Sequence, residues 1–392
     1  MDRARLHEGI RQMRFEQIFD RWERSELSQS EAAVLLGVGE RTFRRWSVRH
    51  RDDGVAGLRD RRLGPSPLRA APEEIERMLG LYRDLYHGFT VKHFHEKLVT
   101  RHNYKLGYTV TKLHLQRTGL VTKAKRRSAH RKKRPRRPMT GMMLHQDASM
   151  HAWLPGTTCK HDLVVTLDDA TGAIYSAFLT DEEGTASSFR GLREVVARHG
   201  LFCSLYTDRG SHYFFTPEAG GKVSKTVLTQ VGRALKQLGI EAIAGYSPQG
   251  RGRSERAFLT LQDRLPKEFR LAGIDTVEAA NHWLTETFID EYNRLFAIEP
   301  AQAESAFVPD RIGAWREVLC VQEERVVGND NTVKWETLSL QLPPSRLRPH
   351  FVKATVRVHA YPDGRLAVYL GPHRLADYDA RGVLTEPERE AA

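Results

Sequence analysis

The sequence predicts a multidomain protein with all-helical N-terminal blocks, a central α/β region built on a mixed sheet, and a small C-terminal β-barrel. Three observations support this prediction. Apolar residues recur at helical spacing up to about residue 122, strand-like and helix-like runs alternate over 139–310, and short alternating segments separated by turns fill 311–392. With 392 residues, the chain is long enough for roughly two to four domains.

The charge balance indicates the kind of partner. The chain has 61 Lys and Arg against 49 Asp and Glu, a formal net charge of +12 at pH 7. No run of about 18 uncharged apolar residues occurs, and the N-terminus is too charged for a signal peptide. We therefore expect a cytoplasmic protein without a membrane partner, whose polyanion is nucleic acid.

Cysteine usage is typical of a reducing compartment. Cys159, Cys203 and Cys320 are few, far apart and odd in number. This excludes a disulfide framework and a cysteine-rich zinc site. We expect all three to be packing residues.

Residues 1–62 contain the pattern of a helix-turn-helix. Residues 5–24 predict an amphipathic helix, and Ser28 with Glu31 forms the capping box of a second helix that ends at Gly37. A third helix over 40–46 is then the recognition helix, although an ordinary helical hairpin fits the same spacing. The apolar residues of the first helix are Leu6, Ile10, Met13, Phe15, Ile18 and Trp22, and the outward DNA-contacting candidates of the third are Arg41, Arg44 and Arg45.

Residues 63–122 predict a second helical block. This region opens with a linker that contains three prolines, and helical periodicity begins after it, at Glu73. The last helix, 109–117, is a candidate second recognition helix with Lys112 as a DNA contact.

Three histidines in this block have the side chain of a zinc ligand. They are His93, His95 and His102. No cysteine pair or fourth ligand is near them, so we interpret them as solvated helix histidines rather than a metal site.

A basic linker, residues 123–138, joins the helical blocks to the α/β region. Residues 123–137 contain ten Lys or Arg and no acid, so the segment cannot pack against itself. We expect an extended arm that becomes ordered on DNA phosphates, although a solvated linker or localisation-like tract fits the same composition. The candidate DNA contacts are Arg126, Arg127, Arg131, Lys132, Lys133, Arg134, Arg136 and Arg137.

The region 139–310 has the element order of a mixed sheet covered by helices. Apolar runs over 163–167 and 174–179 predict a hairpin, with Asp168 and Asp169 as residues of its turn rather than catalytic acids. Helices and strands then alternate, ending with a helix predicted over 252–266 and another after it.

The C-terminal region, 311–392, reads as a β domain. From Val318 onward, polar and apolar residues alternate, with turns at Gly-Asn-Asp-Asn and Pro-Asp-Gly. We predict an antiparallel barrel of five or six strands.

Three acids of the central region could meet at one place. Asp147 is predicted at the end of the first strand and Asp208 at the end of a later one, so the two carboxylates meet if these strands are neighbours. Glu255 begins a helix after a Gly-rich turn and could supply a third oxygen ligand for a hard divalent cation. Taken singly, each acid could instead cap a turn or pair with an arginine.

The segments "HQDAS", "YTDRGSHYF" and "YSPQGRGRSER" together resemble the DDE transposase and retroviral integrase superfamily, whose core is ribonuclease H-like. The resemblance covers roughly residues 139–310 and extends to "DEYNRL" at 290–295. The flanking blocks resemble those of bacterial insertion-sequence transposases of the ISNCY or IS481 groups. One departure is that Asp208 and Glu255 are 47 residues apart, which is longer than usual, with the excess expected in "TPEAGGKVSKT".

The resemblance implies a metal-dependent transposase. Asp147, Asp208 and Glu255 would be catalytic ligands of two Mg²⁺ ions, with Mn²⁺ able to substitute, for 3′-end cleavage and strand transfer. Its partners would be double-stranded DNA, as terminal inverted repeats and target, and at least one further copy of the chain. Its location would be the bacterial cytoplasm, in association with the nucleoid. Residues 247–252 would form a flexible loop, and Arg251 and Arg253 would contact phosphates.

Two other functions fit part of the sequence. A transposase-derived regulator that binds DNA without cutting it explains the charge and the helix-turn-helix pattern, but not three acids at matching positions. A metal nuclease that only hydrolyses DNA explains the acids. Strand-transfer products would separate it from a transposase.

Overall fold

The computed structural model describes residues 3–59, 70–123, 134–218, 221–246, 248–310 and 313–385, with the backbone alone at 3–8 and 248–251. The chain divides into two compact units, Met1–Leu81 with Lys105–His114, and Tyr82–Tyr104 with Leu115–Ala392. Among the helices within these ranges, none is long and apolar enough to cross a membrane.

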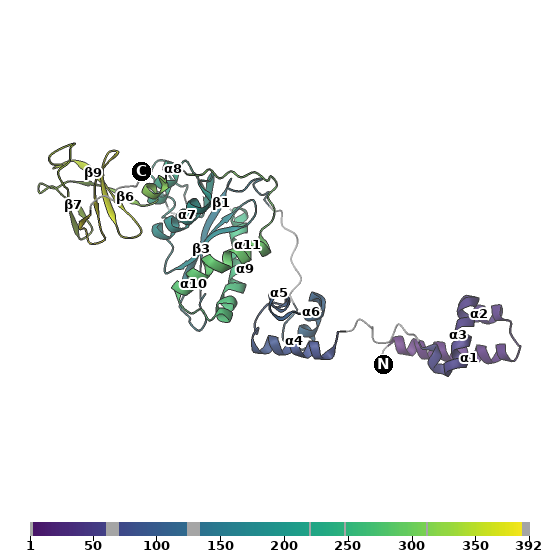
Figure 1. Ribbon diagram of the computed structural model, residues 1–392. Coiled ribbons are helices and arrows are strands. Elements are labelled where there is room, and N and C mark those ends of the chain that lie inside the picture. The colour runs from purple at the N-terminus through teal and green to yellow at the C-terminus, as the bar shows by residue number, and fades with distance from the viewer. Residues whose placement is uncertain are drawn as a thin grey trace. The chain divides into compact units, whose positions relative to one another are not determined.

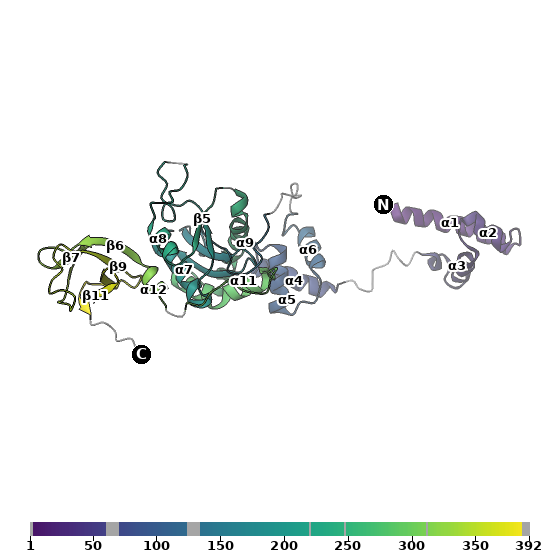
Figure 2. The same ribbon diagram turned by 90° about the horizontal axis from the view of Figure 1, so that it is seen from above.

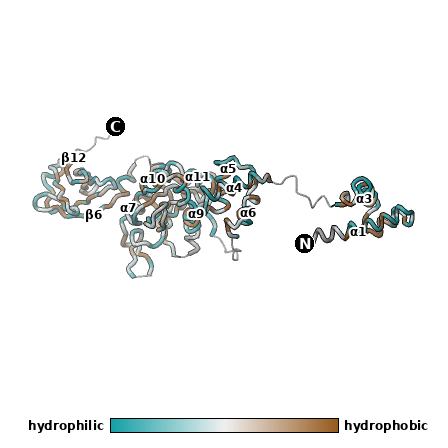
Figure 3. Tube along the Cα trace, turned by 90° about the horizontal axis from the view of Figure 1, so that it is seen from below, coloured by the Kyte–Doolittle hydropathy of each residue, from teal (hydrophilic) through white to brown (hydrophobic). Residues whose placement is uncertain are grey.

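The first unit begins with three helices and a short 3-10 turn (Figure 1). Ser28 and Glu31 make the predicted capping box, and Gly37 ends the second helix at φ +69°, where a side chain would be strained. The third helix runs beyond the predicted end at residue 46, and its tube is mainly hydrophilic in Figure 3. The elements are α1 (Arg3–Glu23), α2 (Gln29–Leu36), α3 (Glu40–Asp53) and η1 (Gly54–Leu58).

The apolar face predicted for α1 is partly wrong. Phe15 and Ile18 pack with Phe43 as expected. Ile10 and Met13, however, are 50% and 59% exposed. The stripe that packs is centred on Phe15 and Phe19, because α2 and α3 cover only the second half of the helix.

The next three helices are α4 (Pro72–Asp84), α5 (Val91–His102) and α6 (Tyr108–Arg117), close to the predicted bounds. In the second unit, the rings of Tyr82 and Phe94 lie 5.0 Å apart and those of Tyr86 and Phe89 lie 5.2 Å apart. The edge-on contact between Tyr82 and Phe94 holds α5 against the end of α4, and the pair Tyr86–Phe89 lies in the connection between the two helices.

The centre of the second unit is a mixed five-stranded sheet in the order β3-β2-β1-β4-β5. The first three strands are antiparallel, and β4 and β5 run parallel to β1. The predicted hairpin is confirmed, with its turn closed by the Gly172 N–H donating to the Asp168 carbonyl. The strands are β1 (Leu144–His151), β2 (His161–Asp168), β3 (Ile174–Thr180), β4 (Ser204–Thr207) and β5 (Glu241–Ala244).

Helices cover both faces of this sheet (Figures 1 and 2). On one face, α7 (Thr185–His199) and α8 (Gln230–Gln237) bury Leu144 and Leu205. On the other, α9 (Pro248–Ala272) and the helices after it bury the apolar side chains of β2 and β3. The latter helices are α10 (Val277–Trp283), the π-turn η3 (Leu284–Phe288) and α11 (Ile289–Phe296).

Helix α9 is longer than predicted at both ends. It already begins at Pro248, so the loop expected over 247–252 is wrong for 248–252, while Ser247 lies outside the described residues. It also continues past Pro266 to Ala272. Proline costs helix stability because it lacks an N–H, but the burial of Leu265 and Phe269 on either side offsets that cost here.

The predicted C-terminal barrel of five or six strands is not confirmed, because the described strands do not close into a barrel. Five of them make an open antiparallel sheet in the order β12-β11-β10-β9-β6, and β7 and β8 pair as a separate ribbon packed on it. The predicted turns are present. The elements are α12 (Trp315–Val318), β6 (Val321–Val326), β7 (Thr332–Trp335), β8 (Leu338–Gln341), β9 (Thr355–Ala360), β10 (Leu366–Leu370), β11 (His373–Tyr378) and β12 (Leu384–Thr385).

Two of the three cysteines are not packing residues. Cys159 and Cys203 are exposed, whereas Cys320 is buried as predicted. The sulfur of Cys320 donates to the carbonyl of Glu317, and burial raises the pKa of the Cys320 thiol to about 11.

A buried polar cluster joins α5 to the second half of α9. His93 Nε2 and Lys97 Nζ each lie 2.6 Å from Glu268 Oε1, and all three side chains are almost fully buried. Beside them, Arg264 donates two hydrogen bonds to the carboxylate of Glu96, at 2.9 and 3.0 Å. The interpretation of His93 as solvated is therefore wrong. Periodicity placed it on a helix but could not show the acid, 175 residues away, that faces it.

Protonation of His93 is disfavoured in the folded chain. Burial lowers the pKa of His93 below its usual 6.5, more than the hydrogen bond to Glu268 raises it. For Glu268, burial alone would raise the pKa of the carboxyl, but hydrogen bonds from His93 and Lys97 lower it below 4.5. The cluster is thus balanced with one negative charge, one positive charge and a neutral imidazole.

We predict that Glu268→Gln lowers the free energy of unfolding by about 3 kcal/mol, because the buried Lys97 ammonium loses its counter-charge. Urea unfolding of the full chain followed by tryptophan fluorescence measures this change. Glu286→Gln, at an exposed position of η3, should change it by less than about 0.5 kcal/mol. Equal effects of the two substitutions would contradict the assigned role of Glu268.

The same cluster predicts loss of stability in mild acid. Below pH 6.5, the unfolded chain takes up a proton at His93 that the folded chain does not, so unfolding becomes more favourable as the pH falls. The melting temperature should therefore drop between pH 7 and 5, and His93→Gln should make that drop smaller. An unchanged slope in the variant would show that other groups control the acid sensitivity.

Candidate active site

Asp147 lies in the middle of β1, not at its end as predicted. It pairs with Val165 of β2, whose side chain packs in the cluster under α9. Paired residues of neighbouring strands point to the same face, so Asp147 faces the side of the sheet that α9 covers. It is 9% exposed.

Asp208 directly follows β4, the neighbour of β1. The two strands are parallel, with Leu144 opposite Leu205 and His145 opposite Tyr206. The two strands are therefore neighbours, which is the condition under which the two carboxylates were expected to meet. Continuing this register by two residues would bring Asp147 opposite Asp208. Asp208 Oδ1 accepts a hydrogen bond from the Gly210 N–H at 2.8 Å, which orients the carboxylate as the chain leaves the sheet.

Glu255 is an exposed residue of α9, which lies along β1. Seven residues later on the same helix, Gln262 donates to Ser149 Oγ of β1 at 2.9 Å. Seven residues are about two helical turns, so Glu255 and Gln262 share one stripe of the helix. Ser149 is two residues from Asp147 and on the same face of β1, so this stripe runs toward the strand that carries Asp147.

The three acids do not form a closed ligand set. In the ranges that the structure covers, no group of three or more His, Cys, Asp and Glu side chains could hold a metal ion. Asp147 lies in β1 and Asp208 directly follows the neighbouring strand β4, and Glu255 is on α9, which lies along β1.

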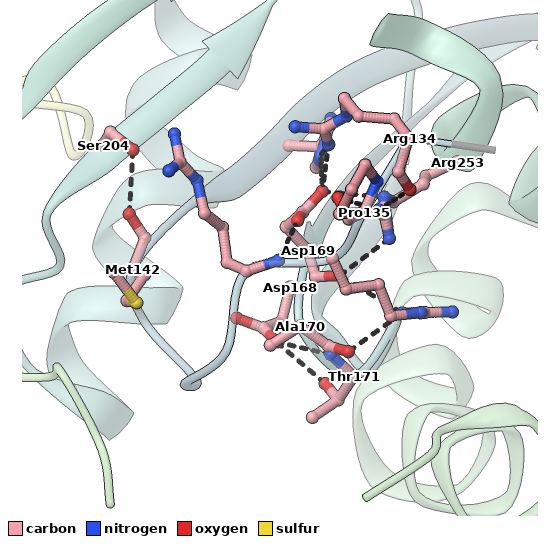
Figure 4. Close-up of polar contacts among 12 residues, drawn as sticks. Arg134, Pro135, Met142, Asp168, Asp169, Ala170, Thr171, Ser204 and Arg253 are labelled. Carbon is pink, nitrogen blue, oxygen red and sulfur yellow. Dashed lines mark hydrogen bonds and ion pairs between the residues drawn. The ribbon is translucent and has the colours of Figure 1, made fainter. Parts of the chain in front are cut away.

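The buried Asp169 carboxylate is the centre of a polar cluster that the sequence did not reveal (Figure 4). Its Oδ1 accepts from His145 Nε2 at 2.8 Å and from Arg134, and forms an ion pair with Arg253 Nε at 2.8 Å. Its Oδ2 accepts from the Arg137 N–H at 2.8 Å. Asp169 is 0% exposed.

The partners of Asp169 keep it ionised. Burial alone would raise the pKa of the carboxyl, but the hydrogen bonds from His145 and Arg137 and the charge of Arg253 outweigh it and lower that pKa to about 2. A carboxylate with this many donors is a strong, directional anchor.

Asp168, the residue before it, holds the turn together. Its Oδ2 accepts from the N–H and the hydroxyl of Thr171 at 2.8 and 3.0 Å, and its Oδ1 accepts from the Gly141 N–H at 3.0 Å. Burial raises the pKa of Asp168, and these hydrogen bonds offset it only in part. Both acids are therefore turn residues as predicted, but buried ones.

Arg253 joins α9 to the end of the basic linker. It donates to the carbonyls of Arg134 and Pro135 at 3.1 and 2.9 Å, and to the Asp169 carbonyl at 3.0 Å. Arg136 donates to the carbonyls of Asp169 and Ala170. These guanidinium groups, predicted only as phosphate contacts, thus have protein partners that the prediction did not include.

The other predicted DNA contacts lie in different parts of the chain. The candidates on α3 and α6 and Arg137 are exposed. The side chain of Arg251 and the linker residues 124–133 lie outside what the structure describes. The exposed candidates on the helices are Arg41, Arg44, Arg45 and Lys112, and the candidates in 124–133 are Arg126, Arg127, Arg131, Lys132 and Lys133.

A shallow depression of about 370 Å³ is lined by Arg209, the residue after Asp208, together with Gly221, Lys222 and Tyr246. Arg209 stacks on the Tyr246 ring at 5.1 Å and donates to the Gly221 carbonyl at 3.0 Å. The segment between Asp208 and Glu255, which is longer than usual in the family, thus contacts the residues that follow strands β4 and β5. The extra length was visible in the sequence, but this contact was not predicted.

Comparison with known proteins gave matches along most of the chain. Residues 23–76 match the family described as winged helix-turn helix. The chain is 32% identical over 365 residues to "Putative transposase y4bF" of Sinorhizobium fredii (strain NBRC 101917 / NGR234), which covers 91% of this chain and 79% of the relative.

Two further proteins are more distant. "Transposase for insertion sequence IS1202" of Streptococcus pneumoniae is 29% identical over 306 residues, covering 69% of this chain and 65% of that protein. Among solved structures, the HTLV-2 integrase catalytic core domain in complex with magnesium is 14% identical, covers 38% of this chain and 88% of that chain, and has a TM-score of 0.28.

We predict that Arg253→Ala lowers the free energy of unfolding by about 3 kcal/mol, because Asp169 keeps a buried charge with fewer partners. Arg44→Ala, at an exposed position of α3, should stay within about 0.5 kcal/mol of the unsubstituted chain. Urea titration of the full chain measures both. If Arg253 acts only as a surface phosphate contact, the two substitutions will be equally mild.

Proposed function

Because the chain belongs to the insertion-sequence transposases of the DDE transposase and integrase superfamily, we propose that it cleaves the 3′ ends of its element and joins them to target DNA. One observation carries the chemical part of this proposal. Asp147 lies in β1, Asp208 directly follows the neighbouring parallel strand β4, and the helix that carries Glu255 lies along β1.

By their chemical type, the three carboxylates are suitable ligands for a hard divalent cation. Carboxylate oxygens on a rigid sheet are the ligands that Mg²⁺ prefers, and it completes its shell with water and substrate phosphate. Asp147 and Asp208 would hold such ions together with Glu255, and Mn²⁺ should replace Mg²⁺. When bound, the ions supply charge stabilisation at the phosphate and activation of the attacking hydroxyl group.

The residues of the chain would position the DNA. Asp208 is held by Gly210 at the point where β4 ends, so its carboxylate is oriented before DNA arrives. Arg209 and Lys222 place positive charge beside it for a strand backbone. The reaction needs no covalent enzyme intermediate, because a DNA 3′ hydroxyl serves as the nucleophile of the joining step.

The N-terminal helices would supply recognition of the element's ends. Residues 23–76 match a winged helix-turn helix, and α3 presents Arg41, Arg44 and Arg45 to solvent. We propose that α3 reads the terminal inverted repeat in the major groove, and that Lys112 of α6 and the basic linker add phosphate contacts. Two ends must be held together for joining, so we propose that at least two copies assemble on DNA.

The test is strand transfer with a labelled duplex that carries the element's own end, in Mg²⁺ or Mn²⁺. The unsubstituted chain should give joined product, and Glu255→Gln should reduce it by ~100-fold or more because a ligand oxygen is lost. DNA-end affinity, measured in Ca²⁺, should be equal for both proteins.

Other results would favour other functions. DNA binding without any cutting by the unsubstituted chain would favour a DNA-binding regulator. Cutting without joining, even from a pre-cut end, would favour a hydrolytic nuclease. Equal joining by the two proteins would remove Glu255 from the site.

A further inference from the structure

The Asp169 cluster lies next to two of the proposed metal ligands through the chain. His145, which donates to Asp169, is two residues before Asp147 on the same face of β1. Arg253, which pairs with Asp169, is two residues before Glu255 on α9. One buried carboxylate therefore connects the strand and the helix from which two of the three acids project.

The other contacts of the cluster involve residues at the end of the basic linker. The Arg137 N–H donates to Asp169 Oδ2, and Arg134 donates to Oδ1. Arg253 in turn holds the carbonyls of Arg134 and Pro135 (Figure 4). Segments separated by up to 119 residues in the sequence thus meet at Asp169 and Arg253.

These contacts can set the position of α9 where apolar packing alone cannot. The apolar residues Phe258 and Leu261 hold α9 on the sheet, but apolar contacts are non-directional. Hydrogen bonds and ion pairs to an ionised group have preferred directions and short distances. The Asp169 contacts fix the first turns of α9, and those turns carry Glu255.

Resting on the proposed function, we propose that Asp169 is a positioning residue of the metal site. It holds His145 and Arg253 together, and this restrains the strand and the helix from which Asp147 and Glu255 project. Asp169 does not touch the ion or the DNA. An asparagine in its place keeps the shape but loses the charge and turns one acceptor into a donor that faces Arg and His donors.

The first test is Mn²⁺ binding to the full chain, measured by EPR of the free ion in the absence of DNA. Asp169→Asn should weaken Mn²⁺ affinity by about 10- to 100-fold, the usual effect of losing a group that orients metal ligands. Affinity for the element-end duplex should change less than about twofold, because the DNA-reading surface of α3 is not part of the cluster.

The matched control is Asp181→Asn. Asp181 follows β3 at the open end of the same hairpin and is 96% exposed. The substitution Asp181→Asn removes the same charge from the same hairpin, so the variant should bind Mn²⁺ with the affinity of the unsubstituted chain. Equal loss in both variants would mean that general charge, not position, governs the ion, and would overturn the proposal.

A second variant guards against simple unfolding. If Asp169→Asn has no melting transition above the assay temperature, Arg253→Lys takes its place, since it keeps the charge but has one donor nitrogen where Arg253 uses three. It should also weaken Mn²⁺ binding by about tenfold or more. A folded Asp169→Asn or Arg253→Lys protein with unchanged Mn²⁺ affinity would overturn the proposal.

Asp208→Asn separates this proposal from the function on which it rests. If that variant binds Mn²⁺ as well as the unsubstituted chain does, the metal site itself is wrongly assigned. If Asp208→Asn loses Mn²⁺ and Asp169→Asn does not, the metal site stands and the positioning role is wrong.

Discussion

The ionised carboxylate of Asp169 is the contact on which the arrangement of the α/β core depends most. A buried charge without partners would cost several kcal/mol, so the fold is stable only when the donors around it are in place. Those donors come from the arm at 134–137, from His145 of β1 and from Arg253 of α9. Because each must reach the same two oxygens, their relative positions are tightly restricted.

Helix α9 is held in the same way near its other end. Glu268 is buried between His93 and Lys97 of α5, about 22 Å along the helix from Arg253. Between these two anchors, the side of α9 that faces the sheet is apolar and includes Leu261 and Leu265. The helix is thus fixed in direction by buried ion pairs at both ends and in depth by apolar packing. A metal ligand carried on such an element needs little reorganisation when an ion binds.

The local features of the fold could be predicted from the sequence because their causes are local. The capping box at Ser28, the hairpin turn at Gly172 and the placement of Asp208 after a strand each depend on a few neighbouring residues. The pairs His93 with Glu268 and Asp169 with Arg253 could not, because periodicity shows which face of an element is buried but not what covers it.

One wrong prediction and one unconfirmed prediction had a different cause. Composition marked residues 247–252 as a loop because Gly and Pro disfavour helices, yet Pro is tolerated in a first turn, where its missing N–H would have no partner, and α9 starts at Pro248. Alternation in 311–392 predicted strands correctly but not closure. Whether β12 meets β6 depends on strand tilt and stagger, which no local pattern records.

The basic composition overstated how much positive charge is free for DNA, although the cluster does not remove that charge entirely. Arg134, Arg136 and Arg253 all have partners at the turn that Asp169 occupies. Asp169 carries one negative charge, while the guanidinium groups of Arg134 and Arg253 both contact it. More than one guanidinium group therefore lies at the start of α9, and Arg134 remains partly exposed there. Arg253 is two residues from Glu255, so the arginines that hold this part of the protein together also determine the charge around the proposed metal ligand.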